Sequence, residues 1–579
     1  MRPKKEGFDA ARLWRRLLGL CLVVLLGMAA GLDCAGGCDC GGEKVQIPLT
    51  PEEKLADFAA HLPAQTDLAF FFVDLEELRG TLTNLSAQFE GSLPLDVYRQ
   101  EASQVIGIDL MDKASFQAAG VVPEGGAALG YYRGSPVVLV YAPDKLKFEA
   151  GVVASLKRNY RVTDEGIQKI PDMPGGVWIS GKGVSFAYAP LPGGLVALVG
   201  QTQGEGSDCR KTLKEVVELE ESSSLGASAT FEGFKQEVGN KWPTSIYINT
   251  PRLLSIYKAF NPTLKAFQKE MLDAVAEQLR WTGVGGRADA SKATGRIFFG
   301  VEKETLERFK GLDKANAKSP RFKMMVGEKA YGFLRSSVNA DIFWREYYKL
   351  MPARQQRYFR TVVDNLKSTT SIDLEKDLVQ NLTGHMGVAI YGLNPMAAMA
   401  RRASQRMTLL TLAAHIQLKD PAAFSALMDR LVKELGGSLR QWRVPGGIVG
   451  YGFDPDSMTA PPFALYLKDD VVTLASTQLG DERVAGHLLG ESPTLRRQLE
   501  EEGSVRLLEA EAATGLYINM PRVHEQIGIL GGRMLNNLLG TPKDVSVLVS
   551  LAEGGISADG SVTFNKPSAT ETPAGAGAP

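Results

Sequence analysis

Histidine and cysteine are scarce in this chain, with five residues of each among 579. The histidines are scattered, and none has a second ligand at the spacing that zinc sites use. The chain also lacks a His-Glu-x-x-His zinc helix and a Gly-x-Ser-x-Gly nucleophile elbow. These absences predict no enzyme, no cofactor and no metal ion. A site assembled from distant carboxylates and histidines is the remaining route to catalysis.

An excess of either charge is also missing, because 65 lysine and arginine residues stand against 66 aspartate and glutamate residues. A nucleic-acid surface needs clustered positive charge, so we expect no nucleic-acid partner. Beyond residue 32 there is no second long apolar run, and the body of the protein is therefore not expected to span a membrane.

The N-terminus carries the clearest biological signal. Its basic residues precede an apolar, uncharged run from Leu17 to Leu32. This order is typical of a secretory signal, and the run is shorter than the roughly 20 residues of a comfortable membrane-spanning helix. Residues 1–32 are therefore predicted to be a signal peptide or a signal anchor. The protein would be exported, and either periplasmic or membrane-anchored facing the periplasm. The basic residues are Arg2, Lys4, Lys5, Arg12, Arg15 and Arg16.

Three of the five cysteines, Cys34, Cys38 and Cys40, lie in a glycine-rich stretch. The small residues before Cys38 match part of a bacterial lipidation signal, but the branched apolar residue is missing. Cys38 is thus a candidate lipidation site that would give the chain a lipid anchor. A closed tetrahedral metal site wants four ligands, and no histidine is near. Residues 33–58 are predicted to be a linker and lead-in to the body.

A six-residue motif occurs twice, as Tyr247-Ile248-Asn249-Thr250-Pro251-Arg252 and as Tyr517-Ile518-Asn519-Met520-Pro521-Arg522. Other short matches keep the same order, among them Asp144 with Asp420. Matches in constant order over a long interval predict two copies of one domain. We expect the first at residues 59–316, the second at residues 317–566 and a disordered tail at residues 567–579.

The repeated motif predicts a strand that runs into a helix. Asn249 and Asn519 can bond the backbone at the turn, and Pro251 and Pro521 suit a first helical position. An alternative is that the asparagine and the arginine bind a ligand at the helix start.

The remaining pattern alternates strand-length apolar runs, glycine and proline turns, and amphipathic helices. Hairpins outnumber β-helix-β crossovers, which favours an α+β fold with a mainly antiparallel sheet packed by helices in each copy. The predicted helices include residues 51–62, 144–160, 264–279 and 420–435. The predicted strands include residues 136–141, 408–418, 463–467, 471–474, 545–551 and 556–564.

Three segments carry a family resemblance: Leu62-Pro63-Ala64 with the strand to Val73-Asp74-Leu75, the step Leu418-Lys419-Asp420-Pro421, and the hairpin from Leu465 to Ser476. On these residues the body resembles an exported bacterial family known as domain of unknown function 3352. The resemblance implies export and this architecture, and it brings no catalytic residues.

One insertion distinguishes the second copy. The stretch from Asn394 to Met407 stands where the first copy has only three residues. Methionine beside arginine suits a partner or a membrane surface, and a plain surface loop is the alternative. The candidate partner contacts are Met396, Met399, Arg401, Arg402 and Arg406.

These patterns together predict an exported cell-envelope protein that acts by binding or scaffolding, with an envelope protein or a lipid as partner. A carrier of an apolar ligand such as a lipid is the first alternative. A hydrolase with a spatially assembled carboxylate and histidine site is the second.

Overall fold

The computed structural model describes most of the body of the chain, and the ranges close this paragraph. The predicted signal segment at 1–32, Cys38, the 316/317 boundary and the tail at 567–579 lie outside them. So do the candidate contacts Met396, Met399, Arg401, Arg402 and Arg406. The described residues are 50–88, 112–181, 183–202, 208–289, 291–314, 326–327, 329–351, 353–394, 397, 407–453, 462–491, 494–501, 513–528 and 542–564.

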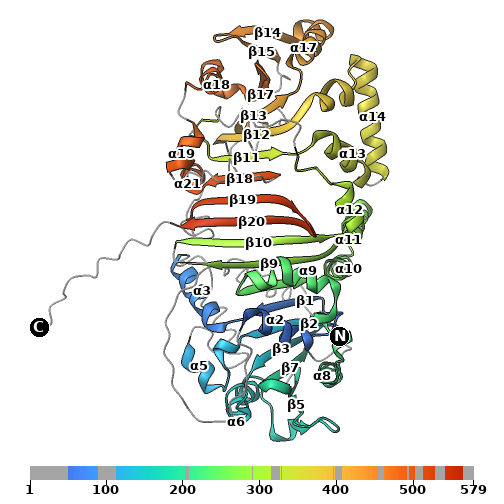
Figure 1. Cartoon of the computed structure of the whole chain (residues 1–579), viewed down its shortest axis with the longest axis vertical. Coiled ribbons are helices and arrows are strands. Elements are labelled where there is room, and N and C mark those ends of the chain that lie inside the picture. The colour runs from blue at the N-terminus through green and yellow to red at the C-terminus, as the bar shows by residue number, and fades with distance from the viewer. Residues whose placement is uncertain are drawn as a thin grey trace, which may run out of the picture.

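The 20 strands of the described residues form one sheet along the length of the molecule, with helices both at the strand ends and packed on the sheet faces (Figure 1). All recorded strand pairs are antiparallel, so the predicted α+β class with antiparallel pairing is confirmed. The strands of the first half are β1 (Leu68–Phe72), β2 (Ala127–Tyr132), β3 (Ser135–Tyr141), β4 (Ile167–Lys169), β5 (Val177–Ser180), β6 (Val184–Pro190), β7 (Leu195–Thr202), β8 (Thr244–Ile248), β9 (Leu279–Ala288) and β10 (Lys292–Val301). Those of the second half are β11 (Gly332–Ser337), β12 (Leu382–Leu393), β13 (Leu410–Leu418), β14 (Leu439–Val444), β15 (Ile448–Phe453), β16 (Phe463–Lys468), β17 (Val471–Ser476), β18 (Thr514–Asn519), β19 (Pro542–Ala552) and β20 (Gly555–Phe564).

The helices begin where the sequence provides caps. Asp144, Asp420 and Asp373 each accept a hydrogen bond from the backbone N–H of a residue in the following first turn. The predicted helix after Asp144 is present as α6, a π-helical turn (Glu149–Val153) and α7. The helices are α2 (Pro51–Ala60), α3 (Leu75–Gln88), α5 (Lys113–Ala118), α6 (Lys145–Phe148), α7 (Ala154–Asn159), α8 (Cys209–Val217), α9 (Ala229–Glu237), α10 (Thr250–Phe260), α11 (Ala266–Gln278), α12 (Lys303–Arg308), α13 (Ala340–Leu350), α14 (Ala353–Thr370), α17 (Pro421–Leu435), α18 (Asp481–Leu488), α19 (Leu495–Glu501) and α21 (Met520–Gly528).

Strand order in space differs from order in sequence. The first half reads β4-β5-β6-β7-β3-β2-β1-β8-β9-β10. The second half reads β14-β15-β16-β17-β13-β12-β11-β18-β19-β20. The last strands of the two halves, β10 and β20, pair with each other over nine residue pairs. The sheet is therefore continuous from one half into the other.

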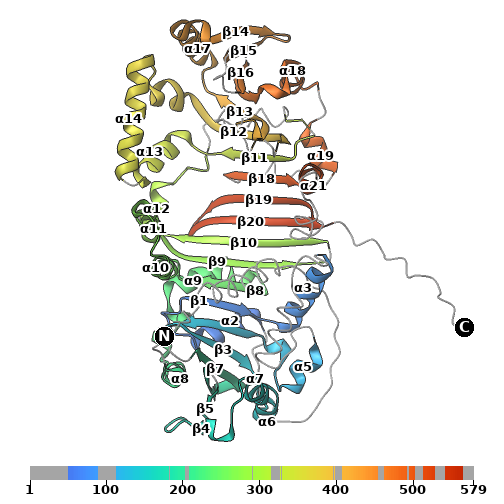
Figure 2. The ribbon, with the colours of Figure 1, turned by 180° about the vertical axis from the view of Figure 1, so that it is seen from behind.

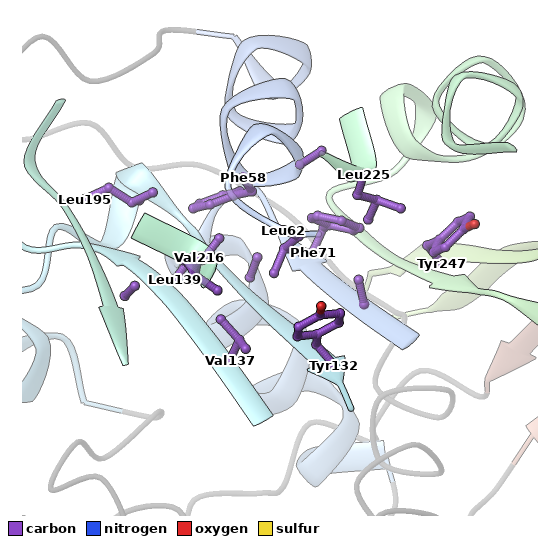
Figure 3. Close-up of a cluster of buried hydrophobic side chains, with 14 of the residues drawn as sticks. Phe58, Leu62, Phe71, Tyr132, Val137, Leu139, Leu195, Val216, Leu225 and Tyr247 are labelled. Atoms are coloured by element: carbon purple, nitrogen blue, oxygen red, sulfur yellow. The ribbon is translucent and has the colours of Figure 1, made fainter. Parts of the chain in front are cut away.

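The first half has its largest core between the sheet and helices α2, α8 and α9. Figure 3 shows Phe58 of α2 with Phe71 of β1, Val216 of α8 and Tyr247 of β8 in this cluster. Phe71 and Phe231 lie with ring centroids 5.6 Å apart. Aromatic rings supply much of the burial here, and they pack α9, through Phe231, and α2, through Phe58, against the strands.

Helix α2 belongs to the folded body. Thr50 caps it in a reciprocal capping box with Glu53, and Leu55 and Phe58 are fully buried. The helical lead-in predicted at 51–62 is thus present. The predicted boundary at residue 58/59 cuts through α2, and the folded body begins at its N-cap because its apolar face is core.

Candidate interaction surface

The repeated motif lies at the junction between a strand and a helix in both halves. Tyr247, one residue before the end of β8, has a buried ring, and its hydroxyl lies 2.9 Å from the hydroxyl of Thr230. Asn249 caps α10 by accepting from the Arg252 N–H at 3.4 Å, and Pro251 occupies its first turn. The strand-to-helix prediction is confirmed here.

The second occurrence repeats this geometry. Tyr517 is buried, and Asn519 accepts from the Arg522 N–H at 3.1 Å, with Pro521 in the first turn of α21. The backbone N–H of Asn519 also donates to the Tyr331 carbonyl at 2.8 Å. Its counterpart in the first half, the Asn249 N–H, donates to the Asp67 carbonyl at 2.9 Å.

The motif arginines also turn back onto the chain. Arg252 forms an ion pair with the buried carboxylate of Asp67, and Arg522 donates to the Ala330 carbonyl at 3.1 Å. Asp67 was not predicted as a partner of Arg252, because it lies 185 residues away in the chain. Both arginines fasten the helix start to the segment before the neighbouring strand, so these contacts are structural.

A different feature distinguishes the surface. Helices α10 to α14 lie in a row along one edge of the sheet, at the right in Figure 1 and at the left in Figure 2. Helix α12 lies in the middle of the row and links its two parts. The Thr305 hydroxyl donates a hydrogen bond to Gln278 of α11, and Arg308 donates one to Glu346 of α13 at 2.9 Å. We call this row the helix edge.

The helix edge exposes nine large apolar side chains, each 38–73% accessible to solvent. They recur at helical spacing: three follow one another at steps of four on α11, and pairs occur on α10, α13 and α14. A surface helix ordinarily turns such a stripe toward the core. The nine are Tyr257, Phe260, Phe267, Met271, Val275, Phe343, Tyr347, Tyr358 and Val362.

The helices of this edge are held by narrow contacts. Neither α11 nor α14 has a buried residue, although α14 is 18 residues long. Helix α14 touches α13 through Phe359, whose ring centroid lies 5.4 Å from that of Trp344 and 6.2 Å from that of Tyr348. Phe359 thus attaches α14 to α13, and the exposed Tyr358 and Val362 take no part in that attachment. Among the described residues, no helix is long and apolar enough to cross a membrane.

One buried carboxylate organises the charge of this edge. Glu346, only 3% exposed, pairs with Arg308 at 2.9 Å, Arg345 at 2.8 Å and Lys349 at 3.1 Å. The hydrogen bond from Arg345, with those from Arg308 and Lys349, lowers the pKa of Glu346 to about 2. This cluster locks α12 against α13.

Positive charge is in excess over the two helices α13 and α14. Residues 340–370 contain six basic and three acidic side chains, a net charge of +3. Arg354, Arg357 and Arg360 of α14 are exposed and make no ion pair within the described chain. Apolar stripe and free positive charge thus share one helix.

Chemistry-bearing groups elsewhere are dispersed or buried. His415 is enclosed in the second half, 2.9 Å from the Thr473 hydroxyl, and burial lowers its pKa to about 3. Burial, and then Arg483, lower the pKa of His487 to about 4. Cys209 is a buried free thiol. The described ranges contain no group of three or more metal-binding side chains.

A pocket of about 510 Å³ lies where the turn after α2 meets α8. Its walls include Gln65, Tyr132 and Glu218, and Arg133 crosses it to bond Glu215 at 3.0 Å. Charged walls that already pair with each other fit an apolar ligand poorly.

Comparisons with known proteins add little. No family model and no curated protein matches the chain, so the resemblance to domain of unknown function 3352 stays a prediction. Two crystal forms of a protein named TP0453 are similar at 12% identity. One covers 42% of this chain and 79% of its own, with a TM-score of 0.23, and the other covers 42% and 92%, with a TM-score of 0.22. Likeness at this level carries no argument about function.

Proposed function

We propose that this protein is an exported, non-catalytic component of the cell envelope that acts by binding or scaffolding, with the helix edge as its binding surface. The observation that carries the proposal is the set of nine large apolar side chains, regularly spaced on four neighbouring helices and turned to solvent. Contiguous exposed apolar surface on a protein marks a site of interaction. The basic and apolar start of the chain supports export.

We also propose that the body consists of two tandem copies of one domain, at about 59–316 and 317–566. The identical strand order in the two halves supports this, as do the paired Asn249 and Asn519 caps. The strand partners of the two motif tyrosines extend this correspondence. Two strands away from Tyr247 the residue in register is Phe298 on β10, and two strands away from Tyr517 it is Ser561 on β20. Phe298 and Ser561 are therefore equivalent positions in the two proposed copies. The two copies would then be joined through equivalent strands.

Duplication has a consequence for the surface. Suppose that the two copies are related by a half-turn about the middle of the sheet. The helices that follow β8 in the first copy and those that follow β11 in the second copy then lie along the same edge of the sheet. That is the arrangement of α10 and α11 with α13 and α14 (Figure 1). A duplicated domain in this arrangement makes one composite surface from two different helix pairs.

Carriage of an apolar ligand is the second candidate, and one observation favours it. Ile297 of β10 is 37% exposed and pairs with Val284 on one side and with Ala558 on the other. Val549 continues this row on β19. A half-open aliphatic strip crossing the middle of the sheet could hold an acyl chain. Lipid in solvent extracts of the purified protein, lost in an Ile297→Asp variant, is the expected result for a carrier.

The binding proposal is tested by a photo-crosslinking amino acid at position 358, in the full chain expressed in its own host. Leu146 on α6 is the matched control site, because it is an isolated apolar residue that is 79% exposed, similar to the 73% of Tyr358. We expect adducts of protein or lipid at 358 and none at 146. Adducts at neither position, or equally at both, would remove the helix edge as a binding surface.

A further inference from the structure

We propose that the helix edge docks on the surface of an anionic lipid bilayer. This inference rests on the proposed binding function and names its partner. The carrying observation is a combination on the same helices: apolar stripes that face solvent, and basic side chains that lack a partner in the described chain. Helices that lie in a membrane interface have this combination of an apolar face and lysine or arginine beside it.

The spacing of the apolar residues suits a planar contact. Phe267, Met271 and Val275 are four residues apart, so they form a line along α11. Phe343 and Tyr347 do the same on α13, with their rings stacked at a centroid distance of 5.2 Å and an interplanar angle of 10°. Side chains aligned along helix axes reach a flat surface together.

Tyrosine contributes three of the nine exposed side chains, Tyr257, Tyr347 and Tyr358. A tyrosine ring is apolar along its body and polar at its hydroxyl, which suits the boundary between acyl chains and headgroups. Long basic side chains can extend from the same depth to the phosphates. Arg354 and Arg357 flank the Tyr358 and Val362 stripe on α14 in this way.

Charge decides between an anionic bilayer and a second copy of the chain. Residues 250–278 carry four basic and three acidic side chains, and residues 340–370 carry six and three, so these segments sum to +4. The whole chain has a net charge of −1. Two such edges placed face to face would repel each other, whereas a bilayer with anionic headgroups attracts each of them.

The length of the N-terminal connection is also compatible with a membrane. Seventeen residues, 33–49, separate the predicted signal segment from the body. Fully extended, they span about 55–60 Å. If the segment is an anchor, or if Cys38 is lipidated, this tether keeps the edge at high effective concentration near the bilayer.

Hydrogen exchange of the full chain tests the inference directly. The protein is mixed with vesicles of phosphatidylglycerol and phosphatidylcholine, or of phosphatidylcholine alone, and amide exchange is followed by mass spectrometry. We expect slower exchange in α11 and α14 with the anionic vesicles only. Helix α17 is the internal control, because it lies away from the edge and buries its own apolar residues.

Two variants separate the contributions. Tyr358→Ser with Val362→Ser removes the stripe of α14 and is expected to abolish its vesicle-dependent protection. Replacing Arg354, Arg357 and Arg360 by glutamine is expected to lower the ratio of docked to undocked protein about 100-fold, or about 5-fold for each charge. Leu146→Ser is the matched control and should leave protection unchanged.

The outcomes are distinguishable from those of the binding proposal. No vesicle-dependent protection, together with protein adducts at position 358, would overturn bilayer docking and keep the binding function. Neither protection nor adducts would overturn both. Protection of α14 that persists in the Tyr358→Ser, Val362→Ser variant would also overturn the inference, because α14 would then not contact the bilayer through its exposed stripe.

Discussion

Arg296 of β10 and Asp559 of β20 face each other as a directly opposed pair in the middle of the sheet. Their side chains are joined by two hydrogen bonds, from Nε to Oδ1 at 2.6 Å and from Nη2 to Oδ2 at 3.2 Å. Tracing the pairings from Tyr247 and Tyr517 makes these two residues counterparts in the proposed copies. Identical residues at this position would bring like charges together, and the chain has opposite charges instead.

The Arg296–Asp559 pair predicts a charge-swap result. Arg296→Asp alone, or Asp559→Arg alone, places like charges opposite each other and should cost about 1–2 kcal/mol of unfolding free energy. The double swap should recover most of this loss in urea unfolding. Recovery will be incomplete, because Glu237 lies 3.5 Å from Arg296 and would face the new aspartate. Additive losses in the double variant would mean that the pair contributes nothing across the seam.

A second prediction concerns the two asparagine caps. Asn249→Ala and Asn519→Ala each remove a side-chain acceptor at a helix start, which should cost about 1 kcal/mol. Thermal unfolding of the two variants checks this, with Asn249→Asp as a control that keeps the cap. Equal and small losses at both sites would fit a repeated structural role. A change in partner adducts with unaltered stability would instead favour the ligand-binding alternative.

Glu346 predicts a stability difference that depends on pH. Glu346→Gln leaves Arg308, Arg345 and Lys349 without their carboxylate and should cost about 1–3 kcal/mol at pH 7. The folded-state pKa of about 2 lies below the ordinary value of 4.5, so the carboxylate stabilises fully above pH 4.5 and loses this effect as the pH falls toward 2.

The difference between wild type and Glu346→Gln should therefore narrow below pH 4.5. Glu307→Gln on α12 is the control, since that side chain is 60% exposed and pairs only with Lys310 in the described chain. A difference that stays constant from pH 7 to pH 3 would show that the glutamine acts through packing and not through charge.

His415 predicts acid sensitivity of the second half. Its folded-state pKa of about 3 lies below the ordinary value of 6.5, so between these pH values the unfolded chain binds the proton and the folded chain does not. Stability is complete above pH 6.5 and declines as the pH falls toward 3. His415→Gln keeps a hydrogen-bonding group beside Thr473 but cannot titrate.

Between pH 6.5 and pH 5, the free energy of unfolding should fall by about 1–2 kcal/mol less in the variant than in the wild type. Chemical denaturation at each pH measures this difference. An unchanged pH profile in His415→Gln would assign the acid response to other groups.

The exposed stripe of α14 predicts a contrast in stability. Tyr358→Ser with Val362→Ser should change the unfolding free energy by less than about 0.5 kcal/mol, because neither side chain supports the fold. Phe298→Ala, at a fully buried ring stacked on Trp281, should cost about 3–5 kcal/mol. Differential scanning calorimetry compares the two. A large loss in the double serine variant would show that the stripe is core in solution.

Local structure was largely predictable from the sequence. The hairpin of β16 and β17, the helix capped by Asp420 and the strand-to-helix motif follow from turn residues, caps and alternation within about ten residues. The pairing of β10 with β20 was not predicted, because neither strand carries a local signal for a partner 263 residues away.

The candidate surface could be predicted only in part. Helix α11 was expected as an amphipathic helix, but the sequence does not tell whether its stripe of Phe267, Met271 and Val275 faces a core or solvent. Helix α14 was not predicted, and none of its residues is buried, so it lacks the core-facing stripe by which a surface helix is ordinarily recognised.

The pairing of β10 with β20 also sets an order in time. Ribosomes make the chain from the N-terminus, so Val301 is complete 263 residues before Phe564 closes β20. At about 5–20 residues per second, the edge of β10 waits about 13–50 s for its neighbour. An open strand edge invites pairing with other chains, including a second nascent copy. Newly made protein therefore passes through an interval of this length in which the edge of β10 is open to premature partners.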